Sequence, residues 1–167
     1  NSAGMIAGNY SAHLHFTSND PTTPALNVPV NLFVQDNILA TVDITLGELT
    51  DIGNEFGVTS ESTDGYDIDI DLPEPQPSPT NYLCAYFPHP EWGLPIGDKF
   101  QTDFRETINP ESELKRWPFV VDTDQTGSVT LSFVTEIAEG VEFWLRDEAV
   151  GVVYNLIPSL NYTYEHS

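Results

Sequence analysis

The chain has 167 residues, of which 40% are hydrophobic, and its 26 acidic and 5 basic residues give a formal net charge of −21. So few Lys and Arg side chains exclude nucleic-acid binding through phosphate contacts and disfavour an anionic membrane surface. The single cysteine, Cys84, excludes an intrachain disulfide, and no apolar run reaches the roughly 18–20 residues of a membrane-spanning helix. We therefore expect one ordinary domain plus a fragment, with solubility as the plain reason for the acidity.

Residues 9–35 have the pattern of a β-hairpin. Two stretches of alternating apolar and polar side chains flank the turn-forming sequence SNDPTTP, and a period of two is typical of strands with one buried face. A hairpin alone is marginal in water, so strands from this chain, another chain or a parent protein must cover it. We therefore expect the chain to begin in the middle of a domain. The expected interface positions are Tyr10, Leu14, Phe16, Leu26, Val28, Val30, Leu32 and Val34.

Strand signals continue after the hairpin. Ile38–Leu46 (ILATVDITL) predicts a further strand, and the stretch 47–66, which contains several glycines, predicts irregular structure. Asp67–Leu72 (DIDIDL) alternates and predicts a short strand with its aspartates facing outward. Proline occupies every second position of residues 73–79, which excludes a helix or a central strand and predicts an extended connector.

The second half of the chain has the spacing of an all-β sandwich. Seven strand-like segments follow one another at intervals of roughly 8–12 residues, with turn residues between them. They are Tyr82–Phe87, Phe100–Glu106, Trp117–Asp122, Ser128–Val134, Val141–Asp147, Val152–Leu156 and Leu160–Tyr164.

The predicted fold class is all-β, an immunoglobulin-like β-sandwich preceded by a β-hairpin from a second, incomplete sandwich. Residues 1–36 are the hairpin, which completes another immunoglobulin-like domain or a neighbouring subunit. Residues 37–79 contain a strand, the irregular segment and the proline-rich connector. Residues 80–167 form the sandwich.

Two parts of the chain resemble known modules. The segments Gly8–Leu14 (GNYSAHL), Ser18–Pro21 (SNDP) and Val28–Val34 (VPVNLFV) resemble the last two strands of a Hydin-like immunoglobulin domain. Residues 56–167, with Ser62–Asp67 (STDGYD) and the sequence YFPHPEW, are similar to a β-sandwich module near the C-termini of large secreted bacterial surface proteins. These resemblances imply modules of long secreted or surface proteins and no catalytic residues.

Three patterns contain candidate metal ligands. His13 and His15 are two residues apart on one strand face, but a zinc site needs a third ligand. Asp67, Asp69 and Asp71 share one face, and residues 122–127 (DTDQTG) resemble the start of a Ca²⁺ loop. Neither fits an EF-hand, so we expect solvated strand faces and a hairpin turn. No cofactor is expected, and Ca²⁺ is the one cation with a weak signal.

The sequence contains no recognisable catalytic motif. Cys84 lies between Leu83 and Ala85 without an adjacent basic group to lower its pKa, which favours an inert thiol. No nucleophile elbow, metalloprotease motif or phosphate-binding loop occurs. We therefore expect no catalytic residues and no enzymatic activity.

Two tryptophans are candidates for a binding surface. Trp144 alternates with Phe143 and Leu145, so its side chain is expected to face outward. An outward tryptophan indicates an interface, a covered structural position or, together with Trp92, a platform for sugars.

The leading hypothesis is a non-catalytic structural or adhesive module of a secreted or cell-surface bacterial assembly, which associates by β-strand addition. Its partners are other protein chains, either identical subunits or a larger parent protein. Two alternatives stay open: an accessory β-sandwich chain of a larger secreted enzyme, and a carbohydrate-binding module.

Overall fold

A computed structural model of the chain describes residues 8–17, 25–34, 38–107, 114–136, 141–157 and 160–167. Its contacts divide the chain into two compact units, Asn1–Asp36 and Asn37–Ser167. Twelve strands and one short 3-10 turn, Pro90–Trp92, make up the regular structure of the described residues. The predicted all-β class is therefore confirmed. No helix in this part of the chain has the length and apolar character needed to cross a membrane.

The first unit is the predicted hairpin. Strand β1 (Gly8–Thr17) pairs with β2 (Ala25–Val34) in an antiparallel register that runs from Gly8 opposite Val34 to Thr17 opposite Ala25. Leu14 lies opposite Val28, so the apolar positions of both strands share one face. The predicted turn between the strands lies outside the described residues.

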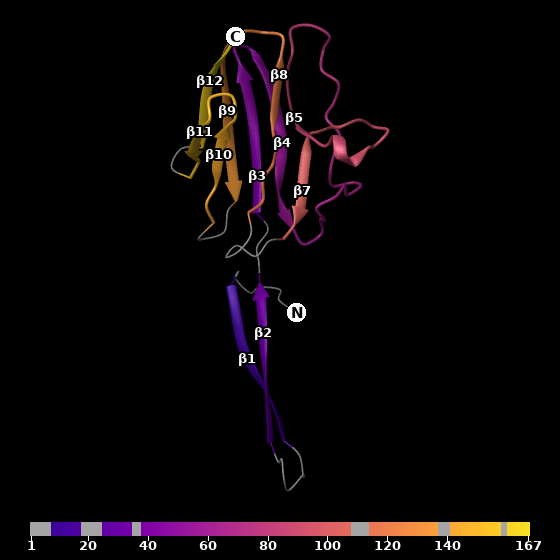
Figure 1. The fold of residues 1–167 in the computed structure, drawn as a ribbon, viewed down its shortest axis with the longest axis vertical. Helices are drawn as coiled ribbons and strands as arrows, with labels where there is room; N and C mark the ends of the chain where they lie inside the picture. The colour runs from indigo at the N-terminus through magenta and orange to yellow at the C-terminus, as the bar shows by residue number, and fades with distance from the viewer. Residues whose placement is uncertain (1–7, 18–24, 35–37, 108–113, 137–140, 158–159) are drawn as a thin grey trace. The chain divides into compact units, whose positions relative to one another are not determined.

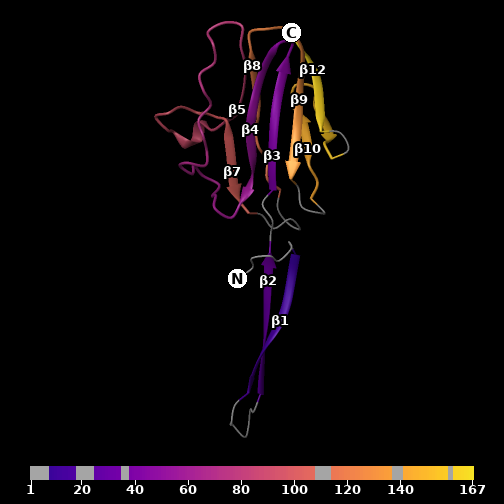
Figure 2. The ribbon, with the colours of Figure 1, turned by 180° about the vertical axis from the view of Figure 1, so that it is seen from behind.

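The second unit has a large sheet and a smaller second layer (Figures 1 and 2). The strand order of the large sheet is β12-β9-β3-β4-β7, and all neighbours are antiparallel except β4 and β7. Its bounds are β3 Ile38–Leu46, β4 Leu49–Thr59, β7 Thr102–Glu106, β9 Gly127–Glu136 and β12 Asn161–His166. The smaller layer contains the sheet β6-β5-β8 and the hairpin β10-β11. Its bounds are β5 Leu83–Pro88, β6 Lys99–Phe100, β8 Val120–Thr123, β10 Trp144–Asp147 and β11 Val152–Asn155.

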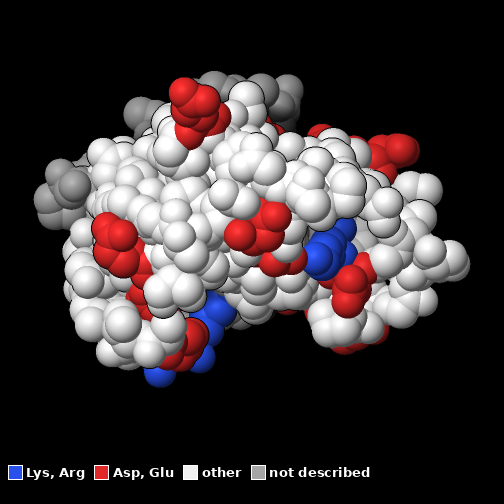
Figure 3. Space-filling view, turned by 90° about the horizontal axis from the view of Figure 1, so that it is seen from above, with Lys and Arg blue, Asp and Glu red and all other residues white. Residues whose placement is uncertain are grey.

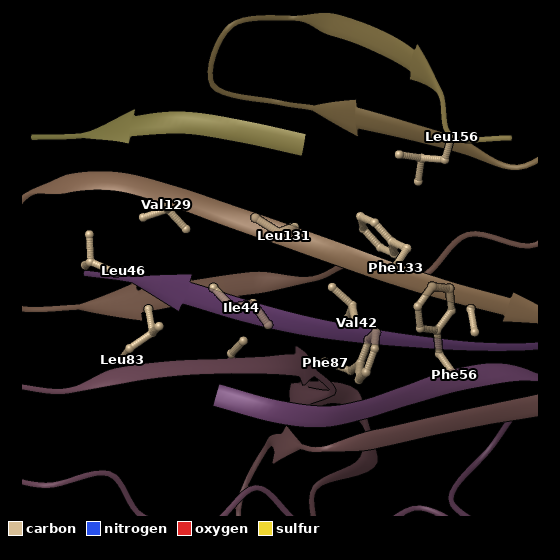
Figure 4. Packing of buried hydrophobic residues seen from close by; sticks show 12 residues of the cluster. Val42, Ile44, Leu46, Phe56, Leu83, Phe87, Val129, Leu131, Phe133 and Leu156 are labelled. Carbon is tan, nitrogen blue, oxygen red and sulfur yellow. The ribbon is translucent and has the colours of Figure 1, made fainter. Parts of the chain in front are cut away.

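The hydrophobic core lies between these layers. Alternate residues of β3 and β9 point to the same side and meet β5 from the opposite layer, as Figure 4 shows. Phe56 brings the aromatic part of the core together, with ring centroids 5.4 Å from Phe87 and 5.8 Å from Phe143. The buried members are Ala40, Val42, Ile44, Leu46, Phe56, Leu83, Ala85, Phe87, Val129, Leu131, Phe133 and Leu156.

Two local predictions are wrong. The stretch 47–66, predicted as irregular, contains β4, a central strand of the large sheet. Its glycines serve the strand instead of ending it: Gly47 forms the β3–β4 turn with a φ of 60°, and Gly57 lies against the backbone of Ile38. Because β3 and β4 share one sheet with β9, residues 37–79 contribute to the sandwich that was predicted to begin at residue 80.

The predicted strand Asp67–Leu72 is a turn. Its exposure does not follow the predicted alternation, because Ile68 is 73% exposed and Asp71 is fully buried, whereas Asp69 is exposed. The Asp71 carboxylate accepts hydrogen bonds from the backbone N–H groups of Asp67, at 2.7 Å, and Phe104, at 3.0 Å. The need of these buried N–H groups for an acceptor therefore places Asp71 inside the fold, although the apolar alternation predicts that it faces outward. The proline-rich residues after this turn form no helix, as expected, and Pro73 makes an isolated bridge to Phe100.

Gly57→Ala is expected to lower the free energy of unfolding by at least about 2 kcal/mol. A Cβ atom at this position would lie 1.9 Å from the backbone oxygen of Ile38, which belongs to the neighbouring strand and cannot move independently. Denaturant unfolding measures the change, provided that the dependence of the unfolding free energy on denaturant concentration is the same in wild type and variant.

The matched control is Gly65→Ala, where the nearest atom is Thr63 Oγ1 at 3.7 Å, an ordinary contact distance. This substitution is expected to change the stability by no more than about 0.5 kcal/mol. Equal losses in the two variants would show that β4 does not approach β3 as closely as the structure has it.

Candidate interface and polar clusters

One face of the hairpin β1–β2 exposes large apolar side chains. Leu14, Phe16 and Leu26 are 52%, 54% and 57% exposed, and Val30 is exposed as well. Val28 is half-buried. Tyr10 belongs to the same face, while the side chains of Leu32 and Val34 lie outside the described set. A contiguous apolar face of this kind is typical of an interaction surface.

The opposite face of the hairpin is polar. Ser11 Oγ donates to Asn31 Oδ1 at 2.8 Å, and His15 pairs with Asn27 across the strands. His13 and His15 occur in no group of three metal ligands among the residues that the structure describes. In that part of the chain the only strand pairing of β1 and β2 is with each other, and the outer edges of a two-stranded sheet can accept a further strand.

The hairpin also differs from the rest of the chain in charge. Residues 1–36 contain only two of the 26 acidic residues, Asp20 and Asp36, and no Lys or Arg. Figure 3 shows acidic side chains spread over one face of the molecule, with few basic ones among them. The hairpin itself therefore contributes little like-charge repulsion.

Trp144 faces outward from β10, as its alternation predicts. Its side chain is 51% exposed, and its indole Nε1 donates to Glu142 Oε2 at 3.0 Å. The neighbours Phe143 and Leu145 pack against the core. Val153 on β11 is exposed as well, and because it lies opposite Arg146, two residues after Trp144, it shares the face of Trp144. Trp144 and Val153 therefore form an exposed apolar patch that is smaller than the face of β1–β2.

A charged cluster lies where β5 ends and β7 begins. His89 Nδ1 contacts Glu91 Oε1 at 2.7 Å, and its Nε2 contacts Asp103 Oδ2 at 2.9 Å. Arg105 binds the same Asp103 carboxylate through Nε, at 3.1 Å, and Nη2, at 2.9 Å. His89 and Asp103 are both buried. No catalytic motif contains His89, and nothing local to His89 signals Asp103.

The contacts of this cluster shift the pKa values of its members. Burial lowers the pKa of His89, but the hydrogen bonds to Asp103 and then to Glu91 outweigh it and hold this pKa above its ordinary value of 6.5. Burial raises the pKa of Asp103, but hydrogen bonds from His89 and Arg105 leave it below its ordinary value. The cluster is therefore a compensated buried ion network in which every charged group has an opposite partner.

Trp92 packs into this cluster. Its ring stacks on His89 with centroids 3.7 Å apart and an interplanar angle of 4°, and its edge contacts Phe100 at 4.6 Å. Tyr66 adds a third ring at 5.6 Å. His89 therefore covers one face of Trp92, whose side chain is half-buried. Binding of sugars at Trp92 stays a prediction.

The acidic segments that suggested Ca²⁺ have internal partners. Asp124 accepts hydrogen bonds from the backbone N–H groups of Asn81, at 2.8 Å, and Tyr82, at 3.0 Å. The Asp67 carboxylate accepts from Thr63, and Asp71 caps the backbone as described above. These carboxylates therefore act as caps of turns and strand ends.

His89→Gln is expected to reduce the stability of the protein most below about pH 6.5. A group whose pKa is higher in the folded state contributes stability below its unfolded pKa, and this contribution disappears as the pH rises through the folded pKa. The difference in unfolding free energy between wild type and variant should thus be largest below about pH 6.5 and shrink as the pH rises above that value.

Denaturant unfolding at several pH values measures this difference. Glu74, whose pKa is raised to about 7, titrates in the same range, but it is present in both proteins and cancels in the difference. A difference that stays constant or grows with pH would contradict the ionised state of His89.

No family model, curated protein or solved structure matches this chain. The fold defines it as an all-β, sandwich-like protein with an attached hairpin unit. Its function is inferred from its surfaces, of which the apolar face of β1–β2 departs furthest from an ordinary soluble surface.

Proposed function

We propose that this protein is a non-catalytic structural or adhesive module of a secreted or cell-surface bacterial assembly, and that it joins other protein chains by β-strand addition. The observation that supports this most directly is the exposed apolar face of β1–β2, with Leu14, Phe16 and Leu26 each more than half exposed.

The energetics favour a covered hairpin. Each fully buried side chain of this size contributes roughly 1.5–3 kcal/mol, and β1 and β2 present such side chains on one face. An isolated two-stranded sheet is marginal in water, and additional strands supply both the apolar cover and the missing backbone partners. Association therefore removes the apolar face and the open strand edges in one step.

The charge distribution favours the same surface. A strongly acidic chain repels its own copies and other acidic proteins, and this repulsion is smallest where acidic side chains are fewest. Strands β1 and β2 contain no charged residue apart from the histidines His13 and His15. The hairpin is therefore the part that can approach another chain at the lowest electrostatic cost.

The polar clusters support a structural role. The buried His89 and Asp103 side chains bind one another and their neighbours, and Asp71 caps backbone groups. The polar atoms of these side chains are therefore engaged in contacts within the fold. The resemblance of Gly8–Val34 to the end of a Hydin-like domain agrees with a module of a long surface protein.

Leu14→Asp is expected to abolish assembly. The substitution places a charge in the centre of the apolar face, opposite Val28, where burial in an interface would desolvate it. Light scattering of the purified protein at micromolar concentrations should show masses above that of one chain for the wild type and the mass of a single chain for the variant.

His13→Asp is the matched control, because it adds the same side chain one residue away on the polar face, opposite Pro29. It should assemble like the wild type. A wild type that is monomeric at every concentration would contradict self-assembly. Co-purification with one larger chain, combined with a monomeric isolated protein, would instead favour the accessory chain of a secreted enzyme.

A further inference from the structure

Three side chains from three separate segments meet beside β5. They are Asp51 of β4, Glu74 of the proline-rich connector and Cys84 of β5, and one ligand atom of each lies within 4.8 Å of the other two. In the part of the chain that the structure describes, this is the one group of three side chains whose atoms could hold a metal ion.

The backbone holds each of the three in place. Leu83 and Ala85 point into the core, so Cys84 points to the other side of β5. The connector lies along β6, where Glu74 N donates to Lys99 O at 3.0 Å, and Cys84 Sγ contacts Glu74 Oε1 at 3.7 Å.

Asp51 links the two layers at the same place. Its Oδ2 accepts a hydrogen bond from the backbone N–H of Ala85 at 2.6 Å. Strand β6 pairs with β5 only at Phe87 and Pro88, so it does not pair with Ala85. This contact brings β4 close to β5 beside the buried Cys84, without a strand-to-strand ladder between β4 and β5.

Unpartnered buried atoms concentrate at this cluster. Among the described residues, only Glu74 Oε2 and Asn54 Oδ1 are buried side-chain polar atoms without a hydrogen-bond partner. The fully buried Asn54 donates its Nδ2 to Asp51 Oδ1 at 3.0 Å, so the second unpartnered atom belongs to a residue that is hydrogen-bonded to the cluster. Orphaned buried atoms are rare in folded proteins and commonly mark a bound water or ion.

The positive charge near the cluster does not offset its negative charge: Lys99 acts to lower the pKa values of Glu74 and Cys84, but burial and the neighbouring carboxylates outweigh it. Burial and then the charge of Asp51 raise the pKa of Glu74 to about 7, and burial followed by Glu74 and Asp51 raises the pKa of Cys84 to about 12. Asp43 adds a further negative charge that acts on Asp51. Lys99 is the nearby cation, and its ammonium lies 3.4 Å from Asp122 of β8.

We propose that Asp51, Glu74 and Cys84 bind a divalent cation of borderline softness, with Zn²⁺ as the natural choice and a water molecule as the fourth ligand. A thiolate selects Zn²⁺ over Ca²⁺ or Mg²⁺, and two carboxylates are too few for the six to eight oxygens that Ca²⁺ takes. Tetrahedral zinc sites place neighbouring ligand atoms about 3.5 Å apart, so ligand atoms within 4.8 Å of one another need to close by no more than about 1.5 Å.

Binding exchanges protons for the metal. The Cys84 thiol and the protonated fraction of Glu74 release their protons, and the cation takes their place between the three ligands. The metal then joins β4, the connector and β5, so it fastens the proline-rich segment to the sandwich. This site is independent of the hairpin and of its proposed role in assembly.

Cobalt is the probe, because Co²⁺ occupies zinc sites and a thiolate ligand gives it a charge-transfer absorption in the near ultraviolet. The reduced, metal-free full chain should show this band with one equivalent of Co²⁺, and Zn²⁺ should displace it. Cys84→Ser should remove the band, and Glu74→Gln should weaken cobalt binding by at least about tenfold.

Asp69→Asn is the matched control, because it removes one negative charge, as Glu74→Gln does, but at an exposed residue outside the cluster. Asparagine tolerates the φ of 70° at this position. This variant should keep the band. Cobalt held by His13 or His15 gives no thiolate band, so it does not imitate the result.

Thermal unfolding provides the second measurement. Zn²⁺ should raise the unfolding temperature of the wild type and of Asp69→Asn, and leave that of Cys84→Ser unchanged. Circular dichroism shows whether each variant is folded. The proposal is overturned if folded wild-type protein gives no thiolate band with excess Co²⁺, or if the band persists in Cys84→Ser.

Discussion

The structure of residues 37–167 depends on the burial of one face of β3 and β9 against β5. Val42, Ile44 and Leu46 alternate with outward residues along β3, and every one of them is buried. Strand β3 pairs with β4 on one side and with β9 on the other, and β9 in turn pairs with β12. The buried face of β3 and β9 therefore fixes the register of β4 and β12 as well. The Asp51 cluster and the His89 network are both built on strands that this core holds in register.

Acidic side chains have a second role beyond solubility. Asp51, Asp71 and Asp103 are wholly or partly buried, and each accepts hydrogen bonds at a place where the backbone or a cation would otherwise lack a partner. Asp51 joins the layers, Asp71 fixes the turn after β4 and Asp103 anchors Arg105. A chain with only five basic residues must satisfy such carboxylates mostly with N–H groups, and a metal ion is a further source of positive charge.

The two units differ in how they satisfy the same physical demands. The sandwich buries its apolar strand faces against each other, whereas the hairpin exposes Leu14, Phe16 and Leu26 and leaves two strand edges open. The hairpin therefore gains more from a partner chain than any other described surface does. Trp144 and Val153 form the smaller exposed patch, on a hairpin that is already anchored to the core through Leu145.

The sequence alone determined the all-β class, the hairpin β1–β2, the strand β3 with its bounds and the outward direction of Trp144, because these depend on a local period of two. Only the tertiary structure decided that residues 49–59 are a central strand and that Asp71 is buried. In both places close backbone approach and unpaired N–H groups outweigh the local pattern. The meeting of Asp51, Glu74 and Cys84 also escaped the sequence, because no motif joins residues that come together only through the packing of β4, the connector and β5.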